Sequence, residues 1–184
     1  MFELTDTCHL RLLQESDIDE VHALVEANRA YLSAWLPWAA TQERSDTARF
    51  IESTRKQLRD NDGFQTAIVS DDLIVGLVGF HGVNWPNRAT SLGYWLAERH
   101  QGKGIMTRAV ARLTEHALGA WELNRLEIQV ATDNPRSRAI PERLAFSEEG
   151  TLREAERVGG RYLDIVVYSL LARDWTSRSK APAT

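Results

Sequence analysis

The sequence lacks several features that mark particular classes of protein. Its 184 residues contain one cysteine, Cys8, which excludes an internal disulfide and the cysteine-rich zinc modules. The five histidines show no spacing typical of metal ligands, so we expect no metal. The longest nearly apolar run, 73–80, is far shorter than the roughly 20 residues of a membrane-spanning helix. An acidic amino terminus without an apolar stretch favours a cytoplasmic protein.

The charge balance excludes a further class. With 22 Lys plus Arg against 26 Asp plus Glu, the net charge is −4, so the chain has no general attraction for nucleic acid or for an anionic membrane. The length fits one compact domain, which we assign to 1–176. Residues 177–184 are expected to be a disordered tail.

Helical and strand periodicities alternate along the chain, which predicts an α/β fold with a mixed sheet. Ser16 and Ser45 are expected to cap the first two helices. The predicted elements are helices from Ser16 to about Leu36 and over 45–59, strands over 64–70, 73–83 and 90–97, a helix over 105–121, a strand over 125–131, a short helix within 134–144 and a hairpin of 151–158 and 161–171.

A glycine loop between a predicted strand and a predicted helix is the most informative feature. Arg99, Gly102 and Gly104 form the pattern Arg-x-x-Gly-x-Gly directly before the helix. Glycines let the main chain approach an anion, and the free amides at the helix start point at it. The P-loop and dinucleotide patterns both fail here, because residue 97 is Ala and residue 107 is Thr. The layout predicts a diphosphate site.

This loop resembles the acetyl-CoA loop of the GNAT superfamily of N-acetyltransferases. Over 10–174 the chain is most similar to the RimJ and RimL type, which acetylates ribosomal proteins. The matching motifs are Leu10-Arg11-Leu12, Trp35-Leu36-Pro37-Trp38, Gly93-Tyr94-Trp95-Leu96, Asn134-Pro135-Arg136-Ser137 and Glu149-Gly150-Thr151-Leu152-Arg153. The resemblance implies a twisted, mostly antiparallel sheet flanked by helices, in which the strand near 92–97 splays from the one near 126–131.

The resemblance also implies where acetyl-CoA binds. Main-chain groups around Trp95 and Leu96 hydrogen-bond the pantetheine arm, and Asn134 hydrogen-bonds it too. Gly93 inside a strand pattern predicts a bulge or a close main-chain approach of the kind this arm needs. The diphosphate falls on the loop and helix start, namely Gln101, Gly102, Lys103, Gly104, Ile105 and Met106. The side chains of Lys103, Arg108, Arg136 and Arg138 are candidate phosphate contacts.

Amine acetylation requires a base, and two carboxylates qualify. Glu154 and Glu156 are expected to share a strand face with Leu152 and Val158, where partial burial raises a carboxylate's pKa. Periodicity does not choose between them. The resemblance assigns the base to Glu156 and the acid that protonates the departing thiolate to Ser137. The structural alternatives are an inward charge that discourages edge pairing for Glu156 and a helix N-cap for Ser137.

Aromatic residues are candidates for the acceptor channel, because their rings exclude water: Trp35, Trp38 and Trp85. His81 and His116 are expected to be ordinary surface or core residues. Asp164 is expected to be a hydrogen-bonding structural acid. Two positions depart from the family pattern: Ala145 stands where the family usually has glycine, and Pro141 falls inside the short helix, which bears on the placement of Ser137 and Asn134.

Together these features predict an acetyl-CoA-dependent N-acetyltransferase that transfers the acetyl group directly, since no cysteine is placed to carry it. The preferred acceptor is a protein N-terminal α-amine, on a ribosomal protein by the resemblance. Two alternatives are an acetyltransferase for a small amine, such as a polyamine or an aminoglycoside, and an acetyl-CoA-binding module without catalysis. The terminal hairpin is a candidate contact for a homodimer.

Overall fold

A computed structural model describes residues 2–179, with side chains to residue 175, and contains one eight-stranded sheet in the order β1-β2-β3-β4-β5-β6-β8-β7. All neighbouring strands are antiparallel except β5 and β6. The strands are β1 (Phe2–Thr5), β2 (Cys8–Leu12), β3 (Gln65–Ser70), β4 (Leu73–Asn84), β5 (Ala89–Leu96), β6 (Arg125–Ala131), β7 (Ser147–Val158) and β8 (Arg161–Leu171). The helices are α1 (Ile18–Leu32), α2 (Arg44–Arg59), α3 (Ile105–Glu115), α4 (Pro135–Arg143) and α5 (Ala172–Ser179).

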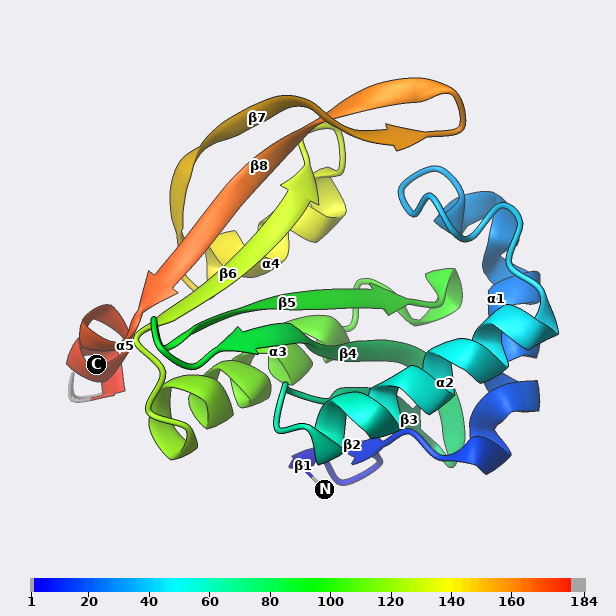
Figure 1. Cartoon of the computed structure of the whole chain (residues 1–184), viewed down its shortest axis with the longest axis horizontal. Helices are drawn as coiled ribbons and strands as arrows, with labels where there is room; N and C mark the ends of the chain where they lie inside the picture. Colours follow the sequence, from blue (N-terminus) through cyan, green and yellow to red (C-terminus); the bar gives the residue numbers. More distant parts are fainter. Residues whose placement is uncertain (1, 180–184) are drawn as a thin grey trace.

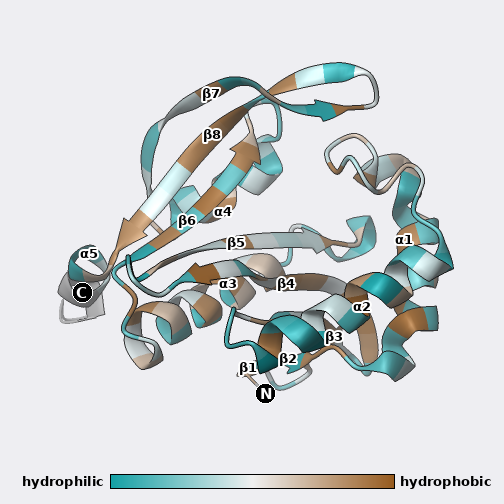
Figure 2. Ribbon diagram, viewed as in Figure 1, coloured by the Kyte–Doolittle hydropathy of each residue, from teal (hydrophilic) through white to brown (hydrophobic). Residues whose placement is uncertain are grey.

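The helices cover both faces of the sheet (Figure 1). Leu113 of α3 and Ile140 of α4 pack with Phe80 and Leu92 in the main core. On the other face, α1 and α2 bury a smaller cluster of side chains against β3 and β4. Apolar residues concentrate in β3 and β4, whereas β7 is hydrophilic along most of its length and exposed at its outer edge (Figure 2). Two layers of helix on a mixed sheet confirm the predicted fold class.

β5 and β6 separate halfway along their length. They pair from Ala89 with Arg125 to Leu92 with Ile128, and no pairing follows. Beyond that point the two strands diverge, as Figure 1 shows, because β6 continues along β8 while β5 continues along β4. The predicted splay is therefore confirmed, and it opens a wedge at the centre of the sheet.

The predicted strands and most helices occur within a few residues of their expected bounds, but the two predicted N-caps are wrong. Gln14 and Glu43 open the first helical turns, and their amides donate to Asp17 Oδ2 at 2.8 Å and Asp46 Oδ2 at 2.9 Å. In both places the cap residue is not the expected serine. The carboxylate three residues further along accepts a hydrogen bond from the amide of the cap residue, as in a capping box.

Three further differences concern the chain ends and α3. β1 is an additional edge strand, and Cys8 lies buried at the start of β2. The helix predicted over 105–121 ends at Glu115 and continues as a π turn, η3 (His116–Ala120), where His116 packs among aromatic rings as a core residue. Residues 177–179 of the expected tail form the end of α5, and 180–184 lie outside the described residues.

Within residues 2–179, no helix combines the length and apolar character that crossing a membrane requires. In the same part of the chain no group of three or more His, Cys, Asp or Glu side chains is arranged to hold a metal ion.

Candidate active site

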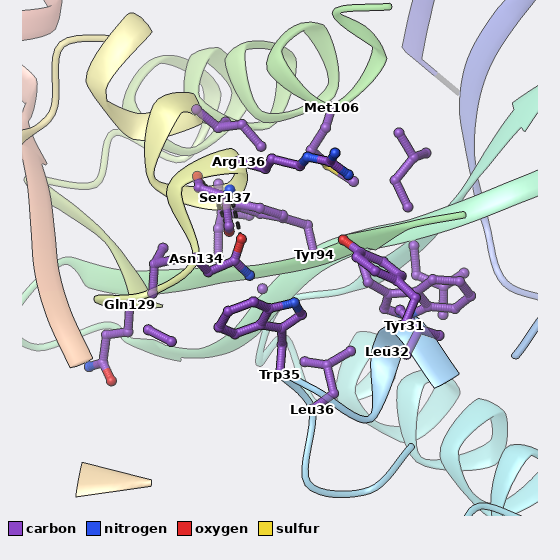
Figure 3. A pocket seen from close by; sticks show the side chains of 18 of the residues that line it. Tyr31, Leu32, Trp35, Leu36, Tyr94, Met106, Gln129, Asn134, Arg136 and Ser137 are labelled. Carbon is purple, nitrogen blue, oxygen red and sulfur yellow. Dashed lines mark hydrogen bonds between the residues drawn. The ribbon is translucent and has the colours of Figure 1, made fainter. Parts of the chain in front are cut away.

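A cleft of about 1770 Å³ occupies the wedge between β5 and β6. One end is lined by the glycine loop and the start of α3, and the other by the segment after α1 and by β7. Side chains from three elements converge on it: Asn134, Arg136 and Ser137 from α4, Tyr94 from β5, and Trp35 from the segment after α1 (Figure 3). The splayed strands thus bring together residues that lie more than a hundred positions apart in sequence, such as Trp35 and Glu156.

The glycine loop has the geometry of an anion cradle. Gly102 and Gly104 have φ of 73° and 74°, in the left-handed region that favours glycine. The first amide of α3 to find an internal partner is that of Arg108, which donates to Gly104 O at 3.1 Å. The amides of 105–107 precede it, and no side chain caps this helix end. A diphosphate fits this set of donors at the positive end of the helix.

Two arginines line the cleft beside the loop. Arg108 donates to Lys103 O at 2.8 Å, and Arg136 donates to Gln101 Oε1 at 3.1 Å. Gln101 also donates to Leu96 O, so the loop is tied to both α4 and β5. Among the residues predicted to bind the cofactor, Trp95, Leu96, Gln101, Gly102, Gly104, Ile105, Met106 and Asn134 line the cleft.

Two predicted phosphate contacts lie elsewhere. The side chain of Lys103 is exposed, and Lys103 is not among the residues that line the cleft. Arg138 turns away from it to donate to Tyr168 Oη at 2.9 Å and to Glu148 Oε2 at 3.3 Å. The prediction of a phosphate contact is therefore wrong for Arg138, whose guanidinium is held in a structural network.

The bulge predicted as one explanation for Gly93 does not occur at this residue. The bulge lies in β4, between Phe80 and Val83, and not at Gly93. A methyl group on Gly93 would clash with the imidazole of His81, with its Cβ 2.8 Å from Cε1 of that ring. The close approach that Gly93 permits is thus made by the side chain of His81, which lines the cleft.

The start of α4 holds Ser137 in a hydrogen-bond network (Figure 3). Asn134 Oδ1 accepts from Ser137 N at 3.1 Å, so Asn134 and not Ser137 is the N-cap. Ser137 Oγ donates to Tyr94 Oη at 3.3 Å, and Tyr94 Oη donates to Ser137 O at 3.1 Å. Burial raises the pKa of Tyr94 well above its ordinary value, so the phenol keeps its proton.

Pro141 explains why Tyr94 reaches that carbonyl. In a regular helix the amide of residue 141 would donate to Ser137 O, but proline has no amide hydrogen. The phenol of Tyr94 supplies the missing donor. The interior proline therefore fits a helix that begins at Pro135, and it leaves Ser137 and Asn134 at the cleft.

The end of α4 contains the other departure from the family pattern. Ala145 N donates to Glu142 O at 3.0 Å and Phe146 N to Pro141 O at 2.9 Å, the two bonds of a Schellman motif. This motif requires a left-handed residue after the helix, and Ala145 takes that position with φ of 56°. An alanine in this conformation is strained, because its Cβ crowds the main chain.

A bulge in β7 separates the two candidate bases. Leu152 pairs with Ile165 and Glu156 with Leu163, so 153–155 lie opposite Asp164 alone. Asp164 Oδ1 accepts from Glu154 N at 2.7 Å, which agrees with its predicted structural role. Glu154, with φ of 51°, is exposed and outside the cleft lining. The prediction of one shared face is wrong, because the bulge inserts residues that break the strand's alternation.

Glu156 lines the cleft and is half-buried. Burial alone raises the pKa of its carboxyl, with no contribution from a neighbouring charge. A carboxylate with a raised pKa in a cleft is suited to accept a proton.

Two of the three predicted acceptor-channel tryptophans line the cleft. Arg161 Cζ lies over the ring of Trp35, 5.7 Å from the ring centroid. Trp38 packs edge-on against Trp95. Trp85 is a wrong prediction: its Nε1 donates to Asn61 O at 2.7 Å, and its ring packs on Trp121 away from the cleft. Its Pro-Asn turn carries it to the far end of the β4–β5 hairpin.

Sequence analysis missed several polar residues of the cleft. They are Gln42, Asp46, Gln65, His81 and Gln129. No motif marks them, because they come from α2, β3, β4, β6 and the segment before α2, which only the fold brings together. The hydrogen bonds between the Tyr94 side chain and Ser137 were also missed, although the motif Gly93-Tyr94-Trp95-Leu96 was recognised.

Comparisons with known proteins agree with this geometry. The family model of the acetyltransferase (GNAT) domain matches residues 8–147. YdaF of Bacillus subtilis, named as a candidate ribosomal N-acetyltransferase, is 38% identical over 168 residues, which cover 90% of this chain and 92% of YdaF. The ribosomal-protein-serine acetyltransferase of Escherichia coli is 27% identical over 168 residues, covering 91% of this chain and 94% of the relative.

A solved structure extends the similarity to the whole fold. The RimL ribosomal-protein α-N-acetyltransferase in complex with coenzyme A matches with a TM-score of 0.89 at 27% identity, over 94% of this chain and 98% of that chain.

Proposed function

The chain belongs to the GNAT family of acetyltransferases, and from that premise we propose that it transfers the acetyl group of acetyl-CoA to the N-terminal α-amine of a protein. One observation carries the proposal: an anion cradle and a half-buried carboxylate, Glu156, line the same cleft at the splay of β5 and β6. The solved RimL structure contains coenzyme A, and the loop of this chain offers the main-chain donors that a diphosphate requires.

The residues that would hold acetyl-CoA lie along one side of the cleft. The amides after Gly104 would bind the diphosphate, with Arg108 and Arg136 beside them. From Gly93 onward the edge of β5 that faces β6 would bind the pantetheine arm, because β6 has diverged there while the other edge stays paired with β4. When bound, acetyl-CoA supplies an acetyl thioester, whose carbonyl carbon bonds to the acceptor nitrogen as the carbon–sulfur bond breaks.

Two side chains would move the protons. Glu156 accepts a proton from the acceptor nitrogen as the new bond forms, and its raised pKa makes it a stronger base than an exposed glutamate. Ser137 Oγ would donate a proton to the departing sulfur and regain one from water. The hydrogen bond from Ser137 Oγ to Tyr94 and the one from Ser137 N to Asn134 fix its position.

The acceptor end of the cleft favours a peptide over a polyamine. Trp35, Leu36 and Trp38 give it an apolar wall, whereas a polyamine requires several free carboxylates. The carboxylates that line the cleft are Asp46, Glu98 and Glu156. Asp46 accepts from Glu43 N and pairs with Arg49, and Glu98 follows β5 directly before the glycine loop. The net charge of −4 favours a basic protein terminus, as ribosomal proteins carry.

A panel of acceptors tests this function. The purified protein is incubated with labelled acetyl-CoA and a peptide with a free serine or alanine terminus, the same peptide with a blocked terminus, spermidine, or an aminoglycoside. The expected result is label on the free peptide alone. Label on a small amine would show that the acceptor is a small amine and not a protein terminus. Acetyl-CoA binding, measured by calorimetry, without any labelled product would support the non-catalytic alternative. The absence of acetyl-CoA binding would overturn the proposal.

A further inference from the structure

A second ionisable group lines the cleft. His81 lies on β4 at the bulge opposite β5, and it lines the cleft together with Glu156 of β7. Its Nδ1 lies 3.0 Å from Ser91 Oγ. The other ring nitrogen, Nε2, lies over the Cα of Gly93, and no hydrogen bond to Nε2 occurs within the described part of the chain.

The position over Gly93 matters because of what lies next to it. Gly93 is the first residue of β5 beyond the last pair with β6, where the strands part. The main chain that follows is the one proposed to hold the pantetheine arm, so the ring of His81 lies beside the proposed reacting end of the cleft. A larger residue at 93 would displace the ring, which gives the glycine a functional reason.

The reaction leaves work for a second base. A protein terminus enters as an ammonium group, because its pKa of about 8 lies above neutral pH. On acetylation the nitrogen loses two protons. One is matched by the proton that the departing thiolate takes up, and the other is released to solvent. Glu156 can accept only one at a time.

Resting on the proposed function, we infer that His81 accepts the first proton of the acceptor ammonium. The lone pair of Nε2 takes the proton and leaves the amine neutral, so that its own lone pair can form the bond to carbon. The imidazolium then releases the proton to water at the mouth of the cleft. This assignment has Nδ1 carrying its hydrogen and donating it to Ser91 Oγ, which fixes the tautomer in which Nε2 can accept.

The surroundings of His81 keep it neutral at physiological pH. Charged groups on the neighbouring elements are Asp62, which accepts from Val83 N, Asp46 at the start of α2, Glu127 on β6 and Glu156 on β7. Desolvation is the cause of the lowered pKa of His81, with no contribution from these charges. The ring is therefore unprotonated and able to accept when the acceptor arrives.

The pH dependence of kcat/KM tests the inference with the acceptor that the wild type acetylates. The wild type should lose activity on the acid side with a midpoint below 6.5, as His81 becomes protonated. In His81→Gln, only acceptor that is already neutral can react. The acid midpoint should move up to about 8, the pKa of the amine, and activity at pH 7 should fall at least tenfold. Ser91→Ala should show a smaller loss in the same direction.

Two results separate the alternatives. His9→Gln, on β2 outside the cleft, should keep the wild-type profile. An unmoved midpoint in His81→Gln, with acetyl-CoA binding and turnover intact, would overturn the inference while leaving the proposed function standing.

A measurement that needs no turnover covers the case in which no acceptor is acetylated. The NMR signal of His81, assigned by its loss in His81→Gln, is titrated with the free-terminus peptide. A nearby ammonium should lower the pKa of the ring further, and the blocked peptide should not; equal effects of the two peptides would overturn the inference.

Discussion

The two walls of the cleft are built in different ways. The loop wall, residues 93–106, presents main-chain amides to the cleft, and its only left-handed residues are the glycines at 102 and 104. The hairpin wall, residues 134–156, presents side chains, and it contains an interior proline, left-handed residues at Ala145 and Glu154, and a strand bulge.

This difference teaches how each kind of site is encoded. An anion cradle needs exposed amides, which a glycine pattern and a helix start specify directly. Placing a carboxylate and a hydroxyl at the same point needs a particular irregular path of the chain, because a regular strand or helix would aim them elsewhere. If the two walls act separately, a substitution in one should leave the contribution of the other unchanged.

Removing the proposed base should give the largest effect and leave the loop wall untouched. Glu156→Gln keeps the shape of the side chain but cannot accept a proton, so kcat at pH 7 should fall by about 10²- to 10³-fold. The Kd for acetyl-CoA, measured by calorimetry, should stay within about twofold of the wild type, since the two walls are separate. Glu154→Gln, the exposed neighbour in the bulge, is the matched control and should retain full turnover. Equal losses of kcat in the two variants would contradict the assignment of the base to Glu156 alone.

A change in the loop wall should have the converse effect. Gly104→Ala puts a methyl group at φ of 74° and 3.1 Å from Arg108 Nη1, which disturbs the cradle. We expect the Kd for acetyl-CoA to rise about tenfold, while the turnover at saturating acetyl-CoA changes little. Gly119→Ala in η3 is the control, because an added Cβ there meets nothing within 4 Å. A normal Kd in Gly104→Ala would contradict the cradle.

The same contrast decides how far sequence alone could go. The order of elements, the splay and the loop wall followed from periodicity, glycine placement and family resemblance. Trp85 was misplaced because an aromatic residue after a strand looks the same whether it packs on Trp121 or in a cleft. The shared face of Glu154 and Glu156 failed because a bulge depends on the partner residue Asp164, ten positions away, which periodicity does not include. No sequence signal places His81 at the cleft, because its environment is made by another strand.

Tyr94 connects the two walls, and its removal should affect stability as well as rate. Tyr94→Phe deletes the donor to Ser137 O, and Pro141 offers no replacement. An unsatisfied, partly buried carbonyl should lower the free energy of unfolding by about 1–2 kcal/mol, measured by urea denaturation. Loss of the partner of Ser137 Oγ should lower kcat severalfold.

A second substitution tests this explanation of the proline. Pro141→Ala restores an amide that can donate to Ser137 O within the helix. In the double variant, Pro141→Ala should recover most of the stability lost in Tyr94→Phe. Additive losses in a double-mutant cycle would show that the phenol and the proline are unrelated.

The smallest effect should come from strain in the hairpin wall that carries no chemistry. Ala145 occupies the left-handed position after α4, and glycine adopts this conformation without crowding. Ala145→Gly should therefore raise the free energy of unfolding by about 0.5–1 kcal/mol, even though glycine loses more entropy on folding. Ala27→Gly, the same substitution at an exposed position inside α1, should lower it by a similar amount. Opposite signs for one chemical change would show that the main-chain angle at 145 sets the difference. Unchanged kcat in Ala145→Gly would then separate the strained turn from the irregularities at Pro141 and 153–155, which position Ser137 and Glu156.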